Sequence, residues 1–504
     1  MNPAPALLAV DLGTGSVRVA AFAPDGQQLA YYARGLTLYN PAPGHFEQDP
    51  EQWWQETARL LGRVMADLSG VRPVALSVCG QMHAALPLDQ AGTLLLPRVP
   101  LWNDKRCTAQ VRAFSRHPQA SQLEALAANP ATAAWSGFRI SWLRRYHPKL
   151  YERTATFLTP KDYLNFRLTG VRASDYSEGS GSFLMEAAGL NYHPRLLEAL
   201  GVERDKLPPL YPSWQTIGWV TAAAAEETGL PRGLPVTAGG GDFPVALLGM
   251  GVIGAGVLAD LTGTSANTAV VTAQPVRRGD ISNIHTATGQ WAPCVVLEAG
   301  GDCLHWARRA LAASRLEFAD FIHLAETVPP GAQRLLFLPY LSGQRLGPPV
   351  RAQFFGITHA HGPGHFYRAV LEGLSFAAHR GNRTLLAAGL AFERVIAAGG
   401  GARSHLWLTI KAGIYNRPVY PLHNLESGLL GGAALGGLSI GLYADTAAAV
   451  ARLVRWQPPV RPDPALADYY ARLGEIFDAL YASNVELCSR LEELERMTGQ
   501  GPDR

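Results

Sequence analysis

The chain has 504 residues, a formal net charge of +3, 17% charged residues and 47% hydrophobic ones. This length predicts two large domains, and the apolar and aromatic content excludes a disordered chain. Since no basic stripe occurs, nucleic acid is not expected as a partner. The five dispersed cysteines lack zinc-site spacing, which predicts reduced thiols and a cytoplasmic protein. We expect neither a signal peptide nor a membrane-spanning segment, and hence no membrane partner.

The N-terminus predicts a three-stranded antiparallel meander, because short apolar runs alternate with turns that contain Gly or Pro. These runs cover residues 7–11, 16–22 and 28–38. A helix is expected from Pro50, with Asp49 as its N-cap and Gln52 in the capping-box position. After a strand at residues 74–78, strands alternate with helical stretches, which is typical of an α/β protein.

The first strand–turn–strand pattern occurs a second time. LLAVDLGTGSVRVAAF covers residues 7–22, and VLADLTGTSANTAVV covers residues 257–271. A repeat at half the chain length predicts two related domains, with the Gly- and Pro-rich stretch 229–235 between them. The end of the chain has the apolar spacing of an amphipathic helix that packs on the body. The expected divisions are an N-terminal domain at 1–230, a C-terminal domain at 231–462, and a helix with a polar tail at 463–504.

Each repeated hairpin contains a Gly-Thr turn, Gly13-Thr14 in the first copy and Gly263-Thr264 in the second. Successive backbone N–H groups in such turns can bind an anion. One copy alone fits an ordinary hairpin, whereas two copies could hold the two ends of a triphosphate. Asp11 adds a carboxylate where Mg²⁺ could bind. The Gly triplet 399–401 follows an apolar strand and permits close approach of a base and ribose.

Three further glycines, 239–241, end a strand and precede Asp242, so a substrate could approach this carboxylate closely. In phosphoryl transfer, a carboxylate beside the attacking hydroxyl accepts its proton. We also expect Asp242 to be a helix N-cap, a compatible role. The stretch 249–254 matches G-x-G-x-x-G but precedes a strand, so it predicts a helix end and a turn. No G-x-x-x-x-G-K-[ST] occurs, so backbone amides, hydroxyls and metal must hold the phosphate.

These elements, in this order, resemble the superfamily of sugar kinases, Hsp70 and actin, and the chain is identified as a member of the FGGY carbohydrate kinases. Within that family it is most similar to xylulokinases, and the resemblance covers about residues 7 to 440. It implies an α/β fold of two related RNase H-like domains, of the actin/hexokinase/Hsp70 ATPase type, around a deep cleft. The stretches that carry it include Gly80-Gln81-Met82-His83, Leu101-Trp102-Asn103-Asp104, Pro160-Lys161-Asp162-Tyr163-Leu164 and Ser174-Asp175-Tyr176-Ser177.

The resemblance also implies residue roles. Asp242 would be the catalytic base, and Asp11 and Asp242 would hold Mg²⁺. The sugar would meet Met82, His83, Trp102, Asp104, Asp242 and Phe243. ATP would be held by Gly13, Thr14, Arg18, Gly263, Thr264, Gly400, Gly401 and Arg403. Without the motif, His83 would be taken as a structural histidine and Trp102 as simple core packing.

The implied reaction transfers the γ-phosphate of ATP to a primary hydroxyl of a ketopentose, with D-xylulose and D-xylulose 5-phosphate as the favoured pair. Phe243 departs from the family pattern, because xylulokinases usually have Asn there. An apolar ring in place of a hydrogen-bonding amide favours the alternative of another ketose or polyol: ribulose, L-xylulose or a sugar alcohol. Further departures are Ala84, Ala266, Gln344 and Gly413. A non-catalytic sensor and an actin-like ATPase are alternatives of another class. Family members are commonly dimers, so a homodimer is expected from the resemblance.

Overall fold

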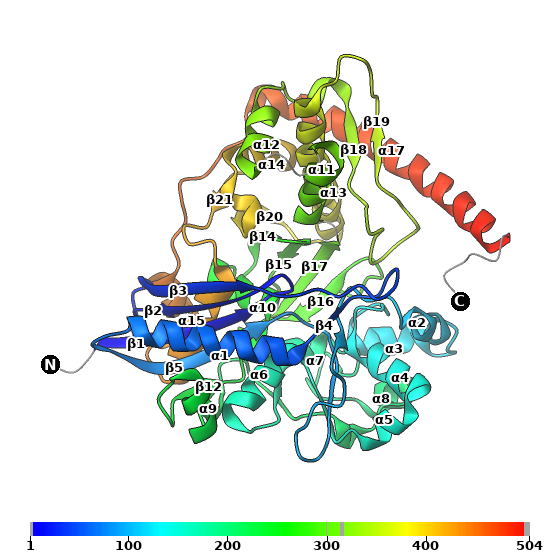
Figure 1. Cartoon of the computed structure of the whole chain (residues 1–504). Coiled ribbons are helices and arrows are strands. Elements are labelled where there is room, and N and C mark those ends of the chain that lie inside the picture. Colours follow the sequence, from blue (N-terminus) through cyan, green and yellow to red (C-terminus); the bar gives the residue numbers. More distant parts are fainter. Residues whose placement is uncertain (1–3, 299, 313–316, 498–504) are drawn as a thin grey trace. The chain divides into compact units, whose positions relative to one another are not determined.

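The computed structural model describes residues 4–298, 300–312 and 317–497 and divides into two compact units (Figure 1). The first unit contains Met1–Ile253, Val271–Ala292 and Glu426–Arg455; the second contains Gly254–Val270, Pro293–Leu425 and Trp456–Arg504. Each contains strands and helices, as the α/β class predicts. The predicted boundary at residue 230 differs from this division. Residues 231–253 belong to the first unit because helix α10 (Asp242–Met250) packs on α15 (Ser427–Ser439).

The first unit is built on one sheet with the strand order β11-β12-β5-β1-β2-β3, and β13 also pairs with β5. β1 pairs with β2, and β2 with β3, in antiparallel fashion, which confirms the predicted meander. β1, β12 and β13 instead run parallel to β5. The bounds are β1 Ala4–Leu12, β2 Ser16–Phe22, β3 Gln28–Gly35, β5 Val71–Gly80, β11 Thr216–Trp219, β12 Pro235–Thr237 and β13 Gly240–Gly241.

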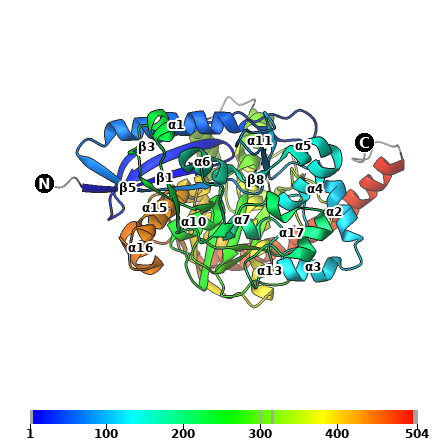
Figure 2. The ribbon, with the colours of Figure 1, turned by 90° about the horizontal axis from the view of Figure 1, so that it is seen from below.

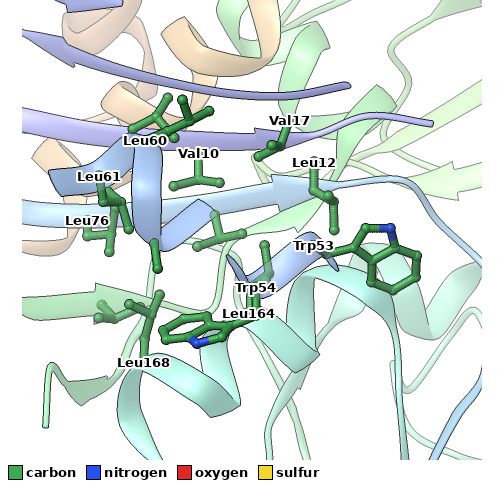
Figure 3. Packing of buried hydrophobic residues seen from close by; sticks show 14 of the residues in the cluster. Val10, Leu12, Val17, Trp53, Trp54, Leu60, Leu61, Leu76, Leu164 and Leu168 are labelled. Atoms are coloured by element: carbon green, nitrogen blue, oxygen red, sulfur yellow. The ribbon is translucent and has the colours of Figure 1, made fainter. Parts of the chain in front are cut away.

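Helices cover both faces of this sheet (Figure 2). Helix α1 (Pro50–Asp67) packs on β2 and β3, whereas α15 packs on β1 and β5. Because successive side chains of a strand point to opposite faces, Val10 and Leu12 belong to the α1 side. There they share a core with Trp53 and Trp54, both at most 1% exposed (Figure 3). The alternate residue, Asp11, lies on the α15 side.

The predicted start of α1 is confirmed in part. Asp49 is the N-cap, its Oδ1 accepts the N–H of Glu51 at 2.8 Å, and Pro50 occupies the first turn. The expected capping box is wrong, because Gln52 is engaged elsewhere. Its Oε1 accepts the N–H of Thr37 at 3.0 Å, which ties the loop after β3 to the helix.

The second unit repeats the pattern of the first. Its strands β15 (Ala266–Val270), β14 (Gly256–Thr262), β20 (Phe392–Ala398) and β21 (Val419–Pro421) are neighbours in that order. β14 and β15 form an antiparallel hairpin, and β14 runs parallel to β20, as β1 forms a hairpin with β2 and runs parallel to β5. The predicted internal repeat is therefore a repeat of topology.

The C-terminal helix α17 (Pro464–Met497) begins and ends close to where it was expected. Leu473 and Phe477 are buried, and the ring of Phe477 stacks on Phe376 of α13 (Pro363–Ala387). The predicted packing on the body is thus confirmed. The stretch 249–254 is a helix end and a turn, as predicted, because α10 ends at Met250 and Gly251 caps it at φ +74°.

The remaining elements complete both units. The strands are β4 Glu47–Gln48, β6 Leu86–Leu88, β7 Val99–Pro100, β8 Thr156–Leu158, β9 Ser174–Asp175, β10 Leu210–Tyr211, β16 Ser282–His285, β17 Trp291–Leu297, β18 Leu336–Leu338 and β19 Gln353–Phe355. The helices are α2 Thr108–Ser115, α3 Ala120–Ala127, α4 Ser136–Tyr146, α5 Pro148–Arg153, α6 Pro160–Thr169, α7 Tyr176–Ser180, α8 Pro194–Leu200, α9 Ala222–Thr228, α11 Gly301–Ala312, α12 Phe318–Glu326, α14 His405–Tyr415 and α16 Thr446–Leu453. In the part of the chain described, every cysteine is free and buried, and no helix has the length and apolar character needed to cross a membrane.

Candidate active site

Three of the predicted motifs leave the sheet of the first unit at one edge. β1 leads into Gly13-Thr14, β5 into Met82-His83, and β13 into Asp242. The strands are parallel neighbours, and the last residue of β1 and the last residue of β13 both pair with Gly80 at the end of β5. In α/β sheets, ligands bind beyond the carboxyl ends of parallel strands. The topology therefore gathers motifs from distant parts of the sequence into one candidate site.

The first Gly-Thr turn is a tight hairpin held by polar side chains. The N–H of Gly13 donates to the carbonyl of Ser16 at 3.0 Å. Gln48 Nε2 donates to the Thr14 carbonyl at 2.7 Å, and Trp102 Nε1 donates to Thr14 Oγ1 at 3.1 Å. Trp102 therefore braces the hairpin. The resemblance implies that Trp102 either contacts the substrate or braces the cleft, and this contact supports the second role; for Gln48 the sequence predicted no role.

Asp11 lies opposite Arg18 across the β1–β2 ladder. Arg18 Nη1 donates to Asp11 Oδ2 at 3.0 Å, and Arg18 Nε is 3.6 Å from Oε2 of Glu426. The carboxylate of Asp11 also faces the first turn of α15, where a Cβ on Gly428 would lie 2.9 Å from Oδ2. A helix N-terminus favours an anion. A cation and a helix start therefore lie beside this carboxylate, although the residue is only 7% exposed.

Asp242 is the first residue of α10, and Gly241 is the N-cap, so the expected N-cap role of Asp242 is wrong by one position. Its Oδ1 still accepts a helix-start amide, the N–H of Phe243, at 2.7 Å. Burial, followed by the negative charge of Asp11, raises the pKa of Asp242 to about 7, and the Phe243 N–H and Arg18 oppose this rise. A carboxyl group that titrates near neutral pH can accept a proton from a hydroxyl and release it again.

Met82 and His83 lie beside the segment that carries Asp242. A Cβ on Gly241 would overlap the sulfur of Met82, so this glycine gives the thioether room directly before the catalytic candidate. The backbone of His83 has φ +72°, in the left-handed region, and its ring meets Trp135 edge-on with centroids 4.9 Å apart. A side chain held in an unusual backbone conformation at a strand end is typical of a functional site.

Asp104 is not placed to meet a sugar. Its side chain is fully buried, and its two oxygens accept the N–H of Phe46 at 2.8 Å and several N–H groups of Arg106 at 2.8–3.0 Å. Arg106 also pairs with Glu47 at 2.7 Å. These bonds occupy the acceptor positions of the carboxylate. The geometry makes Asp104 a brace between two loops, which is the second of the two roles that the resemblance implies for it, and does not support the role of substrate ligand.

The second unit brings the other hairpin next to the Gly triplet. The N–H of Gly263 donates to the carbonyl of Ser265 at 2.9 Å, so this turn is one residue tighter than the first, in which Gly13 donates to Ser16. Gly399 has φ +77°, and a Cβ there would lie 2.6 Å from the carbonyl of Thr262. Gly401 also approaches closely, since a Cβ there would lie 2.8 Å from the Cβ of Thr262, whereas a Cβ on Gly400 would meet nothing within 4 Å. Both belong to a short 3₁₀ helix that ends at Arg403, which lines a cavity of about 530 Å³. The other lining residues are Ala402, His405, Leu408, Pro421, Leu425, Gln457, Pro458, Pro459 and Val460.

A buried ion pair under the second hairpin escaped sequence reasoning. Lys411 Nζ lies 2.6 Å from Asp260 Oδ1 and 2.9 Å from Thr262 Oγ1, and the Tyr415 hydroxyl donates to Asp260 Oδ2 at 2.9 Å. Asp260 and Lys411 are at most 2% exposed. No local pattern in the sequence predicts that Lys411 is buried, because its partner Asp260 is 151 positions away.

The donor set of the first unit fits Mg²⁺. In the described ranges no cluster of three or more His, Cys, Asp or Glu side chains could hold a metal by itself. Mg²⁺ in phosphoryl-transfer enzymes needs only one or two carboxylates, with phosphate oxygens and water completing the shell. Asp11 and Asp242 supply two carboxylates close enough for one to raise the pKa of the other.

Comparison with known proteins gives a consistent result. Residues 6–249 match the N-terminal domain of the FGGY family of carbohydrate kinases, and residues 259–440 match its C-terminal domain. The chain is 33% identical to xylulose kinase of Escherichia coli over 415 residues, which is 81% of this chain and 84% of the relative. It is 28% identical to xylulose kinase of Bacillus subtilis, covering 97% and 99% of the two chains. The crystal structure of xylulose kinase from Rhodospirillum rubrum superposes with a TM-score of 0.85 at 30% identity, covering 95% and 98%.

Proposed function

The chain belongs to the FGGY family of carbohydrate kinases and is an ATP-dependent carbohydrate kinase, and on this premise we propose that it phosphorylates a ketopentose. The proposed reaction transfers the γ-phosphate of ATP to the primary hydroxyl of D-xylulose and gives D-xylulose 5-phosphate. The similarity to xylulose kinases along nearly the whole chain supports this substrate. A cytoplasmic location and a homodimer remain predictions from the sequence.

The observation that carries the proposal is the position of Asp242 beside Met82-His83 at the ends of β13 and β5. An alcohol is a poor nucleophile, and its proton must leave as the new P–O bond forms. Asp242 takes that proton, because its pKa of about 7 lets it accept a proton at neutral pH and return it to water afterwards. Met82 and His83 hold the sugar on the same edge of the sheet.

Phosphate and nucleoside roles follow the two hairpins and the Gly triplet. Gly13, Thr14 and Arg18 would meet the transferred phosphoryl group, Gly263 and Thr264 the other phosphates, and Gly400, Gly401 and Arg403 the nucleoside. Asp11 and Asp242 would hold Mg²⁺, which supplies neutralisation of charge on the phosphate oxygens when bound. Arg18 lies beside Asp11 and adds a second cation at this end of the site.

Phe243 favours a second candidate substrate. Its side chain is 7% exposed and follows Asp242 directly. A site without a hydrogen-bonding side chain there discriminates less against a substrate that lacks the matching hydroxyl. Ribulose, L-xylulose or a sugar alcohol would then be the acceptor, with the same transfer chemistry.

A coupled assay of ADP release with a panel of ketoses and sugar alcohols tests the proposal. We expect D-xylulose to give the highest kcat/KM, and Asp242→Asn to lower kcat by at least about a thousandfold. Highest turnover on another sugar would replace D-xylulose by that sugar and keep the kinase. Sugar binding without any turnover, unchanged by Asp242→Asn, would instead support a non-catalytic sensor.

A further inference from the structure

The short helix α7 (Tyr176–Ser180) contacts both segments that are proposed to lie at the sugar, the one that carries Asp242 and the one that carries His83, although it belongs to neither. On one side, Ser177 Oγ accepts the N–H of Gly241 at 2.9 Å, one residue before Asp242. A Cβ on Gly240 would lie 3.2 Å from the same oxygen, so the strand and the helix are in close contact. The backbone that carries the catalytic base is therefore fixed by a side chain of α7.

A fully buried lysine anchors the beginning of α7. Lys161 has no exposed surface; it pairs with Asp162 and lies 2.9 Å from Asp175 Oδ1. Asp175 is the N-cap of α7, and its Oδ2 accepts the N–H of Ser177 at 2.9 Å. Lys161 also donates to the carbonyl of Ala238 at 3.0 Å. Breaking a buried pair of this kind is strongly unfavourable, so α7 has a fixed position relative to the strand end.

The other side of α7 holds His83. Glu178 is 3% exposed, and its Oε2 accepts the N–H of His83 in a long hydrogen bond of 3.4 Å. Within the described residues its Oε1 has no hydrogen-bond partner. Gly181, directly after α7, admits the imidazole ring: a Cβ there would lie 2.6 Å from Nδ1 of His83. Trp135 closes the opposite side of the ring.

His83 needs such support because its backbone is in the left-handed region, at φ +72°. A residue with a Cβ leaves that conformation unless its surroundings hold it there. Glu178 holds the backbone N–H, while Gly181 and Trp135 confine the ring. Each of these residues contacts His83 and none belongs to the predicted set of sugar ligands.

We propose that Glu178 and Gly181 are positioning residues that set the direction of the His83 imidazole toward the sugar and so determine sugar affinity. This inference rests on the proposed function, because it takes His83 as a sugar ligand. The shape of the sugar site is then determined by α7 and its C-cap, through the carboxyl group of Glu178 and the absence of a side chain at Gly181.

A double-mutant cycle on Gly181 and His83 tests the steric part. In the wild-type background, Gly181→Ala should raise the sugar KM by about tenfold, the equivalent of one lost hydrogen bond, with the ATP KM unchanged. In a His83→Ala background the ring is gone, so Gly181→Ala should have no further effect. Gly279→Ala is the matched control, since a Cβ there meets nothing within 4 Å. Equal effects of Gly181→Ala in both backgrounds would overturn the inference.

Glu178 is tested by a matched pair of substitutions. Glu178→Gln keeps an acceptor for the His83 N–H and should keep the sugar KM within about twofold, whereas Glu178→Leu removes the acceptor and should raise it about tenfold. Equal losses in both variants, or a rise in the ATP KM as large as that in the sugar KM, would contradict positioning of His83. If the wild-type protein turns over no sugar at all, the proposed function fails. If it turns over sugar and the variants behave like wild type, only this inference fails.

Discussion

Asp11 lies near the end of β1 and Asp242 directly follows β13, two strands that run parallel to β5, and the charge of Asp11 contributes to the raised pKa of Asp242. Burial and the charge of Asp11 thus make the ionised form of Asp242 unfavourable in the native protein. Such groups lower stability in exchange for reactivity. The relationship leads directly to a dependence of stability on pH.

We expect Asp242→Asn to be more stable than wild type at pH 8, in the absence of ATP and metal. The native carboxyl keeps its proton up to about pH 7, whereas in the unfolded chain it ionises near the ordinary value of 3.8. The native state therefore binds more protons between these values, and its stability falls as pH rises through this window. Removing the charge should raise the free energy of unfolding by roughly 4 kcal/mol at pH 8 and by little at pH 4. Denaturant unfolding of both proteins at the two pH values measures this, and equal differences at both would contradict it.

Because of His285, we expect the stability of the protein to fall as the pH is lowered, the opposite of the dependence caused by Asp242. His285 is 4% exposed between the rings of Tyr176 and Trp291, and burial lowers its pKa to about 4. The unfolded chain binds a proton already near 6.5, so the stability that neutral His285 confers is complete above that value and lost as pH falls toward 4. The loss amounts to about 2 kcal/mol at pH 5.

Thermal unfolding of wild type and His285→Phe at about pH 7.5 and about pH 5, on either side of the ordinary histidine pKa, checks this expectation. The variant should lose less of its Tm on acidification. It should still lose some, because burial also lowers the pKa of His379 to about 4. An equal loss in both proteins would show that His285 does not contribute.

Phe243→Asn should change the choice of sugar more than the choice of nucleotide. An amide beside Asp242 can bond a substrate hydroxyl, and a site built for a hydroxyl discriminates against substrates without it. We expect the ratio of kcat/KM for D-xylulose to that for ribulose, in which one hydroxyl has the opposite configuration, to rise about tenfold, with the ATP KM unchanged. Phe243→Leu is the control, since it stays apolar and should leave the ratio as in wild type. A parallel change in both variants would point to packing instead of hydrogen bonding.

Gly249 and Gly254 belong to the same G-x-G-x-x-G match but should differ sharply when replaced by alanine. A Cβ on Gly249 would overlap the carbonyl of Ser427 and lie 2.6 Å from the N of Gly431, where α10 crosses α15. Since backbone cannot yield as a flexible side chain does, Gly249→Ala should lower the free energy of unfolding by about 2 kcal/mol or more. Gly254→Ala, with nothing within 4 Å of its Cβ, should be nearly neutral. The denaturant midpoints of the two variants measure this difference, and similar values would refute the steric explanation for Gly249.

Local signals in the sequence predicted much of the fold. The meander of β1 to β3, the cap at Asp49 and the end of α10 at Gly251 each depend on residues close together in the chain. The two Gly-Thr hairpins were predictable for the same reason, because a tight turn is specified by its own few residues. Asp242 was recognised since three glycines precede it, although its place as the first helical residue was missed by one position.

Contacts between residues that are far apart in the sequence could not be predicted from such local signals. Nothing near Asp104 in the sequence indicates that the N–H of Phe46, 58 positions away, donates to its carboxylate, and nothing near Lys161 indicates full burial. The domain boundary was placed by the composition of a Gly- and Pro-rich stretch, whereas the packing of α10 on α15 determines to which unit residues 231–253 belong.

The sequence by itself determined the family of this protein and the parts of the proposed site: two Gly-Thr hairpins proposed to bind phosphate, a Gly triplet proposed to bind the nucleoside, and the carboxylate of Asp242. Only the tertiary structure decided how these parts act. The parallel order of β1, β5 and β13 sets Asp11 near Asp242 and raises its pKa, and α7 fixes His83 and the backbone before Asp242. The physical reason is that burial and electrostatic coupling depend on distances in space, which a one-dimensional pattern does not contain.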